Sequence, residues 1–164
     1  MTSIGKLSLM AASAALMACS PQAAEQVPEP TQAAAQQDNV SPAGLEIIPV
    51  TVTTDDGTHV FTTEVAATTE EKARGMMFRT EMAPDEAMIF PYNVAEMLGF
   101  WMRNTVLPLD IIFIAEDGTI INIEDGVPYN ETSVRSAAPA VAVLEIIGGR
   151  AEELGIEAGD RVEW

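Results

Sequence analysis

Two arginines, each placed directly after an apolar tripeptide, are the first candidates for chemistry in this sequence. Arg79 follows Met-Met-Phe, and Arg103 follows Phe-Trp-Met. A guanidinium group in such a place can hold a carboxylate, a phosphate or sugar hydroxyls through its planar fork of donors. Trp101 could stack on the same ligand, although tryptophan more often packs in a core. We therefore expect Arg79, Trp101, Arg103 and Asn104 to bind a small anionic or carbohydrate ligand.

Asp110 is the fifth residue of this candidate site, because it lies at the start of a strongly apolar segment. Buried charges are usually paired, so Asp110 could simply pair with Arg79 or Arg103 inside the domain. It could instead act as a general acid or base on a substrate held by the two arginines. The sequence shows no second catalytic carboxylate, serine motif or histidine beside it. A non-catalytic ligand-binding or protein-interaction domain is thus the leading interpretation, and an enzyme centred on Asp110 is the alternative.

Composition argues against several other classes of function. The chain has one cysteine and one histidine, which disfavours a zinc site, a disulfide and a Cys–His dyad. Its methionines could bind Cu(I), but they are not clustered and are better explained as core residues. We expect no metal and no cofactor. The net charge is −17, with 25 acidic and 8 basic side chains, and such an acidic protein repels phosphate backbones. Nucleic acid is therefore not an expected partner.

The N-terminal segment has the features of a bacterial lipoprotein signal. One lysine precedes an apolar run that ends in Leu-Met-Ala-Cys at residues 16–19. That run is shorter than the roughly 20 residues of a transmembrane helix, so residues 1–18 are expected to be a cleaved signal peptide. Cys19 would then carry the lipid. Residues 19–44 are rich in Ala, Gln and Pro and predict a flexible tether. Because Ser20 follows the cysteine, we expect a periplasm-facing lipoprotein of the cell envelope at the outer membrane.

Residues 45–164 are expected to fold as one globular β-rich domain. Short apolar runs alternate there with turn signals, and the runs on either side of Glu-Asp-Gly at 116–118 predict a central hairpin. Thr68 and Glu71 have the spacing of a capping box, which predicts a short helix ending at Gly75. The expected strands are 45–54, 58–66, 88–90, 99–102, 109–115, 119–124 and 141–147, with a turn of helix at 151–154 before the last segment. This pattern is typical of an α+β, mainly β, barrel-like domain of about seven short strands with two short helices.

Three segments together resemble a known family. They are Gly-Met-Met-Phe-Arg at 75–79, Phe-Trp-Met-Arg-Asn-Thr-Val-Leu-Pro-Leu-Asp-Ile-Ile-Phe-Ile at 100–114, and Gly-Ile-Glu-Ala-Gly-Asp-Arg-Val at 155–162. The chain is similar in these segments to the bacterial and archaeal family called domain of unknown function 192. The resemblance implies a compact β-rich domain, often exported, with no established activity.

Mass spectrometry of the mature protein tests the expected membrane anchor. The pattern at residues 16–19 predicts that Cys19 is the N-terminal residue and carries covalent lipid. An unmodified Cys19, or cleavage at another position in protein extracted from membranes, would contradict this prediction.

Overall fold

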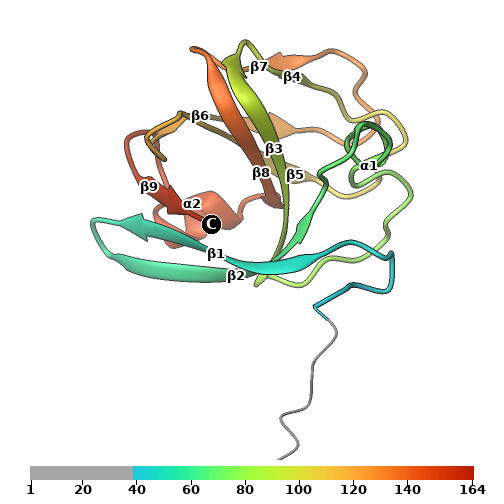
Figure 1. Ribbon diagram of the computed structural model, residues 1–164, viewed down its shortest axis with the longest axis horizontal. Helices are drawn as coiled ribbons and strands as arrows, with labels where there is room; N and C mark the ends of the chain where they lie inside the picture. The colour runs from blue at the N-terminus through green and yellow to red at the C-terminus, as the bar shows by residue number, and fades with distance from the viewer. Residues whose placement is uncertain (1–38) are drawn as a thin grey trace, which may run out of the picture. The chain divides into compact units, whose positions relative to one another are not determined.

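The structure is a computed structural model that describes residues 39–164, so the expected signal peptide and Cys19 lie outside the described residues. In Figure 1 the strands curve around the middle of the domain, α1 lies at its edge among the loops, and α2 lies near the C-terminus. The elements are β1 (Ile47–Thr54), β2 (Gly57–Val65), α1 (Thr69–Arg74), β3 (Glu86–Glu96), β4 (Gly99–Phe100), β5 (Leu109–Ile114), β6 (Ile120–Gly126), β7 (Val134–Arg135), β8 (Ala140–Ile147), α2 (Arg150–Leu154) and β9 (Arg161–Glu163).

Seven of the strands form one sheet in the order β6-β5-β8-β3-β2-β1-β9, and β4 pairs separately with β7. Within the large sheet only β2 and β3 run parallel. The expectation of a mainly β domain with two short helices is confirmed. The expected barrel is wrong, because this sheet is open. Thr119 and Arg161 form an isolated bridge between its two margins, and no ladder joins β6 to β9.

Strand β3 differs from the sequence-based expectation. The sequence predicts separate strands at 88–90 and 99–102, with Pro91 in the connection between them. The strand instead runs through Pro91, and its pairing with β8 shifts register between Pro91 and Glu96. Such an irregularity accommodates the N–H that proline lacks without ending the strand.

Strand β5 lies at the centre of the domain and all six of its residues are buried. Its side chains alternate between two apolar clusters, with Ile112 and Ile114 in one and Ile111 and Phe113 in the other. The first cluster packs against α2, and the second lies under α1 and the loops that follow it. Burial of this kind contributes about 25 cal/mol for each Å² of apolar surface removed from water.

Helix α1 begins at the expected capping box. The Thr68 hydroxyl accepts a hydrogen bond from the Glu71 N–H at 3.2 Å, and the Glu71 carboxylate accepts one from the Thr68 N–H at 2.7 Å. This backbone hydrogen bond is the main reason why the pKa of Glu71 is lowered. The cap fixes the direction of a helix of six residues, and so places Lys72 and Arg74 beside the second cluster.

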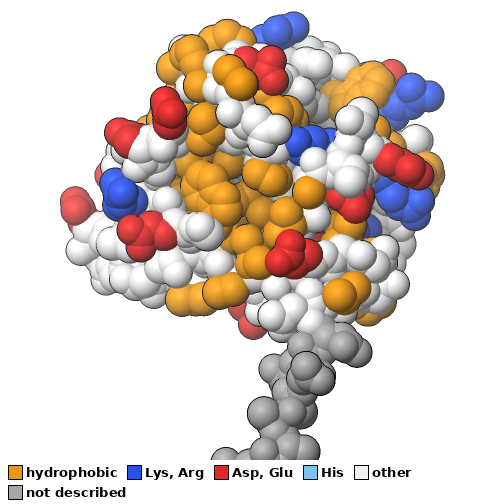
Figure 2. Space-filling model, viewed as in Figure 1, with side chains coloured by type: hydrophobic (Ala, Val, Ile, Leu, Met, Phe, Trp, Pro, Cys, Tyr) orange, Lys and Arg blue, Asp and Glu red, His pale blue; other side chains and the backbone are white. Residues whose placement is uncertain are grey.

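The globular part extends further toward the N-terminus than residue 45. Ser41 is buried, its hydroxyl accepts a hydrogen bond from the Leu45 N–H, and Val40 forms a bridge with Glu46. Residues 39–44, expected to belong to the tether, therefore pack on the domain. On the face shown in Figure 2, acidic and basic side chains are scattered, and hydrophobic side chains gather around the position of the C-terminus.

Truncation tests this boundary. A protein starting at residue 45 should unfold at a lower temperature than one starting at residue 39, since it lacks Ser41 and its hydrogen bonds. The expected loss is about 1–3 kcal/mol of unfolding free energy. Equal melting temperatures for the two proteins in differential scanning calorimetry would show that residues 39–44 contribute nothing to the fold.

Candidate functional site

Asp110 has a structural role. Its carboxylate oxygens accept hydrogen bonds from the backbone N–H groups of Gly149 (2.9 Å) and Ala151 (2.7 Å), at the start of α2. The side chain is 5% exposed. These N–H groups would otherwise lack partners, so Asp110 fastens α2 to the sheet. The expectation that Asp110 pairs with Arg79 or Arg103 is wrong, because both of its carboxylate oxygens accept hydrogen bonds from backbone N–H groups of a later segment.

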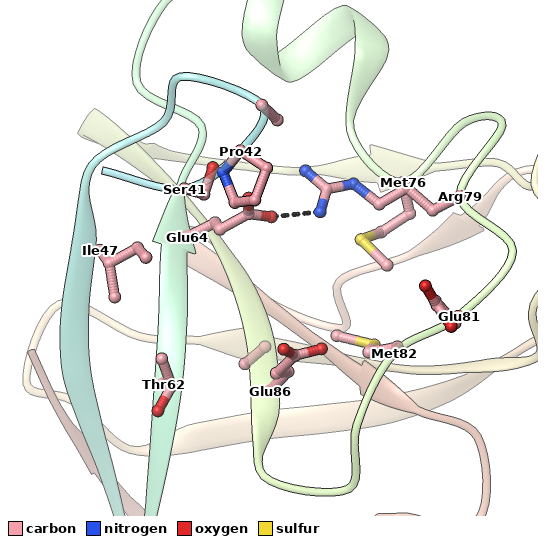
Figure 3. A pocket seen from close by; sticks show the side chains of 12 residues that line it. Ser41, Pro42, Ile47, Thr62, Glu64, Met76, Arg79, Glu81, Met82 and Glu86 are labelled. Atoms are coloured by element: carbon pink, nitrogen blue, oxygen red, sulfur yellow. Dashed lines mark ion pairs between the residues drawn. The ribbon is translucent and has the colours of Figure 1, made fainter. Parts of the chain in front are cut away.

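Arg79 forms an ion pair with Glu64 of β2, with 2.5 Å between its Nη1 and the Glu64 Oε2 (Figure 3). The two side chains are 28% and 14% exposed. They lie at a pocket of about 320 Å³ that Met76 and Met82 line with thioether groups. The ion pair closes the side of this pocket next to the N-terminal segment 41–43.

The charges around this pocket do not favour an anionic ligand. Glu81 and Glu86 line it together with Glu64, whereas Arg79 is the cationic side chain among the lining residues. Because Glu64 already neutralises Arg79, an anion there would meet two further carboxylates. Arg79 alone therefore gives no anion site.

Trp101 and Arg103 lie in the loop after β4. The Arg103 guanidinium stands 5.5 Å above the centre of the Trp101 ring, which is 44% exposed. Such a cation–π contact contributes roughly 0.5–1 kcal/mol at an exposed site. Trp101 lines a cavity with Glu145, and Arg79 and Asp110 line other pockets, so the five expected residues do not share one site.

A shallow hollow on the loops is lined by the non-glycine residues whose backbone has an unusual, positive φ. It has a volume of about 320 Å³ and is lined by Phe78, Thr80, Asn104, Val106 and Tyr129. Within residues 39–164, the non-glycine residues with positive φ are Phe78 (66°), Asn104 (55°) and Tyr129 (62°), and all three line this hollow. For side chains as bulky as Phe and Tyr this conformation costs about 1–2 kcal/mol per residue.

Backbone hydrogen bonds between loops hold this conformation in place. The Phe78 N–H donates to the Asn104 carbonyl at 2.9 Å, and the Tyr129 N–H donates to the Thr105 carbonyl at 3.1 Å. The rings of Phe78 and Tyr129 are nevertheless 67% and 63% exposed. The loops are therefore fixed in a strained form that presents two aromatic rings to solvent.

Glu145 of β8 is a buried acid that the sequence analysis did not single out. It is 4% exposed, and its Oε2 has no hydrogen-bond partner among residues 39–164. Burial raises its pKa to about 8. It lines a cavity of about 40 Å³ between α1 and the loop after β4, beside Phe90, Phe100 and Trp101.

One of these features left a weak signal in the sequence. Glu145 is an acid inside an apolar strand, which indicates either a bulge or a buried carboxyl. The positive φ of Phe78 and Tyr129 left none, because aromatic residues rarely adopt it. Asn104 is the expected site residue that does line the hollow.

Other kinds of site find no support in residues 39–164. That part of the chain contains no group of three or more His, Cys, Asp or Glu placed to hold a metal ion. None of its helices is long and apolar enough to cross a membrane.

The comparisons with known proteins agree with the family resemblance. The chain matches the family model DUF192, described as "Uncharacterized ACR", over residues 50–164. A solved structure of a protein of unknown function from Novosphingobium aromaticivorans is 55% identical; the match covers 76% of this chain and 91% of that chain, with a TM-score of 0.75. A solved structure from Sinorhizobium meliloti, described as a candidate transcription regulator, is 40% identical over 73% of this chain and 94% of that chain, with a TM-score of 0.70. No curated protein matches the chain.

Replacing Asp110 by Asn tests its structural role. The amide keeps one acceptor and loses the other, so one N–H at the start of α2 is left without its partner. We expect the free energy of unfolding, measured by urea denaturation, to fall by about 1–3 kcal/mol. Asp125→Asn is a matched control, because Asp125 lies opposite Asp110 on β6 but is exposed. Equal stability of Asp110→Asn and the control would contradict the structural role.

The pH dependence of stability tests the burial of Glu145. Its pKa rises from 4.5 to about 8 on folding, so the folded state keeps a proton that the unfolded chain releases. Unfolding free energy should therefore fall as pH increases between these two values, by up to about 1.4 kcal/mol per pH unit. Glu145→Gln should remove this fall, whereas Glu116→Gln, in the exposed β5–β6 turn, should retain it. Parallel pH profiles for all three proteins would show that Glu145 titrates normally.

Proposed function

The chain belongs to the DUF192 family, and we propose that its domain is a non-catalytic module that binds a neutral carbohydrate at the loop hollow. The observation that carries the proposal is the coincidence of Phe78, Asn104 and Tyr129, all with positive φ, in one hollow. Backbone strain persists only where the surroundings impose it, and it concentrates at binding sites. Two strained aromatic residues and an asparagine with positive φ, on three separate loops, are difficult to explain by folding alone.

The chemistry of the hollow favours a neutral ligand with hydroxyl groups. No charged side chain is among its lining residues, in a protein whose net charge is −17. The exposed rings of Phe78 and Tyr129 offer flat apolar faces to the C–H face of a sugar. Asn104 and Thr80 add an amide and a hydroxyl that can exchange hydrogen bonds with sugar hydroxyls. Mostly apolar walls with a few polar groups are typical of small-ligand sites.

The same features argue for a carbohydrate over an anionic ligand. Arg79, the cation expected to bind an anion, is neutralised by Glu64, and Arg103 lies over Trp101. Nucleic acid is equally disfavoured as a ligand, because a protein with a net charge of −17 repels phosphate backbones.

We further propose that the domain works at the bacterial envelope as a lipoprotein. The support is the sequence Leu-Met-Ala-Cys at residues 16–19, after a short apolar run. A lipid on Cys19 and the chain that follows it would hold the domain near the envelope, where carbohydrate polymers are abundant.

Tyr129→Gly tests the proposed function, because glycine adopts positive φ without strain. The variant should be as stable as the wild type, or more stable by up to about 1–2 kcal/mol, while losing binding to neutral oligosaccharides. Isothermal titration with N-acetylglucosamine oligomers and β-glucan fragments, beside urea denaturation, measures both effects.

Val94→Ala serves as the control, since Val94 is an exposed apolar residue of β3 outside the hollow. It should leave both stability and binding unchanged. Oligosaccharide binding that survives in Tyr129→Gly would contradict the assignment of the hollow, and a large loss of stability would show that the ring supports the fold instead.

A further inference from the structure

The cavity at Glu145 is separate from the loop hollow and has a different chemistry. Its walls include the rings of Phe90, Phe100 and Trp101 and the thioethers of Met76 and Met77. Its volume of about 40 Å³ has room for a group about three waters in size, since one water needs roughly 10–15 Å³. The cavity is therefore suited to the end of a small molecule.

The cavity has an acidic side chain in its buried part and basic side chains in its more exposed part. Glu145 is buried, and its Oε2 lacks a partner among the described residues. Lys72 is half-buried and Arg74 exposed, and both line the same cavity from α1 and its end. Lys72 does not pair with Glu145, because its ammonium donates to the Pro91 carbonyl and lies 4.2 Å above the Tyr92 ring.

We propose that this cavity binds a small zwitterion of the α-amino acid class. Its ammonium group points inward to Glu145, and its carboxylate stays at the mouth near Lys72 and Arg74. The inner ammonium would supply the donors that Glu145 Oε2 lacks. The aromatic walls would stabilise the same positive charge, as the Trp101 ring already does for Arg103.

Ligands with only one of these charges fit less well. A simple cation would meet the positive side chains of Lys72 and Arg74 at the mouth without a carboxylate to balance them. A simple anion has no hydrogen-bond donor for the unpartnered Oε2 of Glu145. A neutral molecule has no charge to balance an ionised Glu145, so it would leave the carboxyl protonated and release no proton on binding.

Binding of the ammonium group should release a proton. Free Glu145 holds its proton because burial raises its pKa to about 8, and an adjacent ammonium favours the carboxylate form. The other charged or titratable groups around it are Lys72, Arg74, Arg103 and Tyr92, with Glu96 close enough to Tyr92 to act on its pKa. Burial raises the pKa of Tyr92 above its usual value, so the phenol is not the source of the proton.

Isothermal titration of the whole protein with glycine and alanine, at about pH 6.5 in two buffers with different heats of ionisation, tests the proposal. We expect binding with release of nearly one proton, and at least about tenfold weaker binding of methylammonium and of acetate. Glu145→Gln should reduce glycine affinity by at least about tenfold, and Arg74→Gln severalfold. Glu116→Gln is the matched control and should bind as the wild type does.

Three results would overturn the proposal. They are the absence of glycine and alanine binding to the wild type, equal binding of methylammonium or acetate, and undiminished binding to Glu145→Gln. If Glu145→Gln does not fold, as judged by circular dichroism, the proton released by the wild type decides: binding without proton release would exclude Glu145 as the ammonium partner. Oligosaccharide binding at the loop hollow does not depend on any of these results.

Discussion

Two backbone hydrogen bonds fix the loops that form the proposed binding hollow. The Phe78 N–H donates to the Asn104 carbonyl, and the Tyr129 N–H donates to the Thr105 carbonyl. They connect three loops that are distant in sequence and fix them in a form with positive φ at three bulky or polar residues. Neighbouring residues of these loops then divide between two sites: Asn104 lines the hollow, whereas Thr105 lines the cavity at Glu145. Loss of these bonds would release the loops of the hollow, and with them Thr105 at the edge of the cavity.

The sheet provides the rigid base for this arrangement. Strand β5 lies between β6 and β8 and is buried on both faces, so it cannot shift register without exposing one apolar cluster. Glu145 lies opposite Met88 of β3 and Ile111 of β5, and alternation along β8 directs it to the same cluster as Val143. The sheet therefore forces a carboxyl group into an apolar environment, which is why burial alone raises its pKa.

Local patterns in the sequence predicted much of the fold. Apolar runs on either side of a Gly-containing turn gave the β1–β2 and β5–β6 hairpins, and Thr68 with Glu71 gave the start of α1. These features depend on residues close together in the chain. Strand β7, with two residues, is too short to leave a periodic signal. The passage of β3 through Pro91 depends on its partner β8, which local sequence does not identify.

The candidate sites were less predictable, because they depend on contacts between distant segments. Asp110 is satisfied by N–H groups about forty residues later in the chain, and Arg79 by Glu64 of another strand. Charge next to an apolar run correctly indicated that these side chains need partners. The same pattern does not indicate which groups become those partners. The sequence therefore predicted one shared site for residues that line separate pockets.

The most direct test of the account is to map where an oligosaccharide binds. In ¹H–¹⁵N spectra of the labelled protein titrated with N-acetylglucosamine oligomers, the largest shifts should occur at the amides of Phe78, Asn104 and Tyr129. The amides of Ile47, Thr62 and Glu64 at the other pocket should change less. Shifts centred on that second pocket, or no shifts at saturating oligosaccharide, would contradict the claim that the strained loops form the binding site.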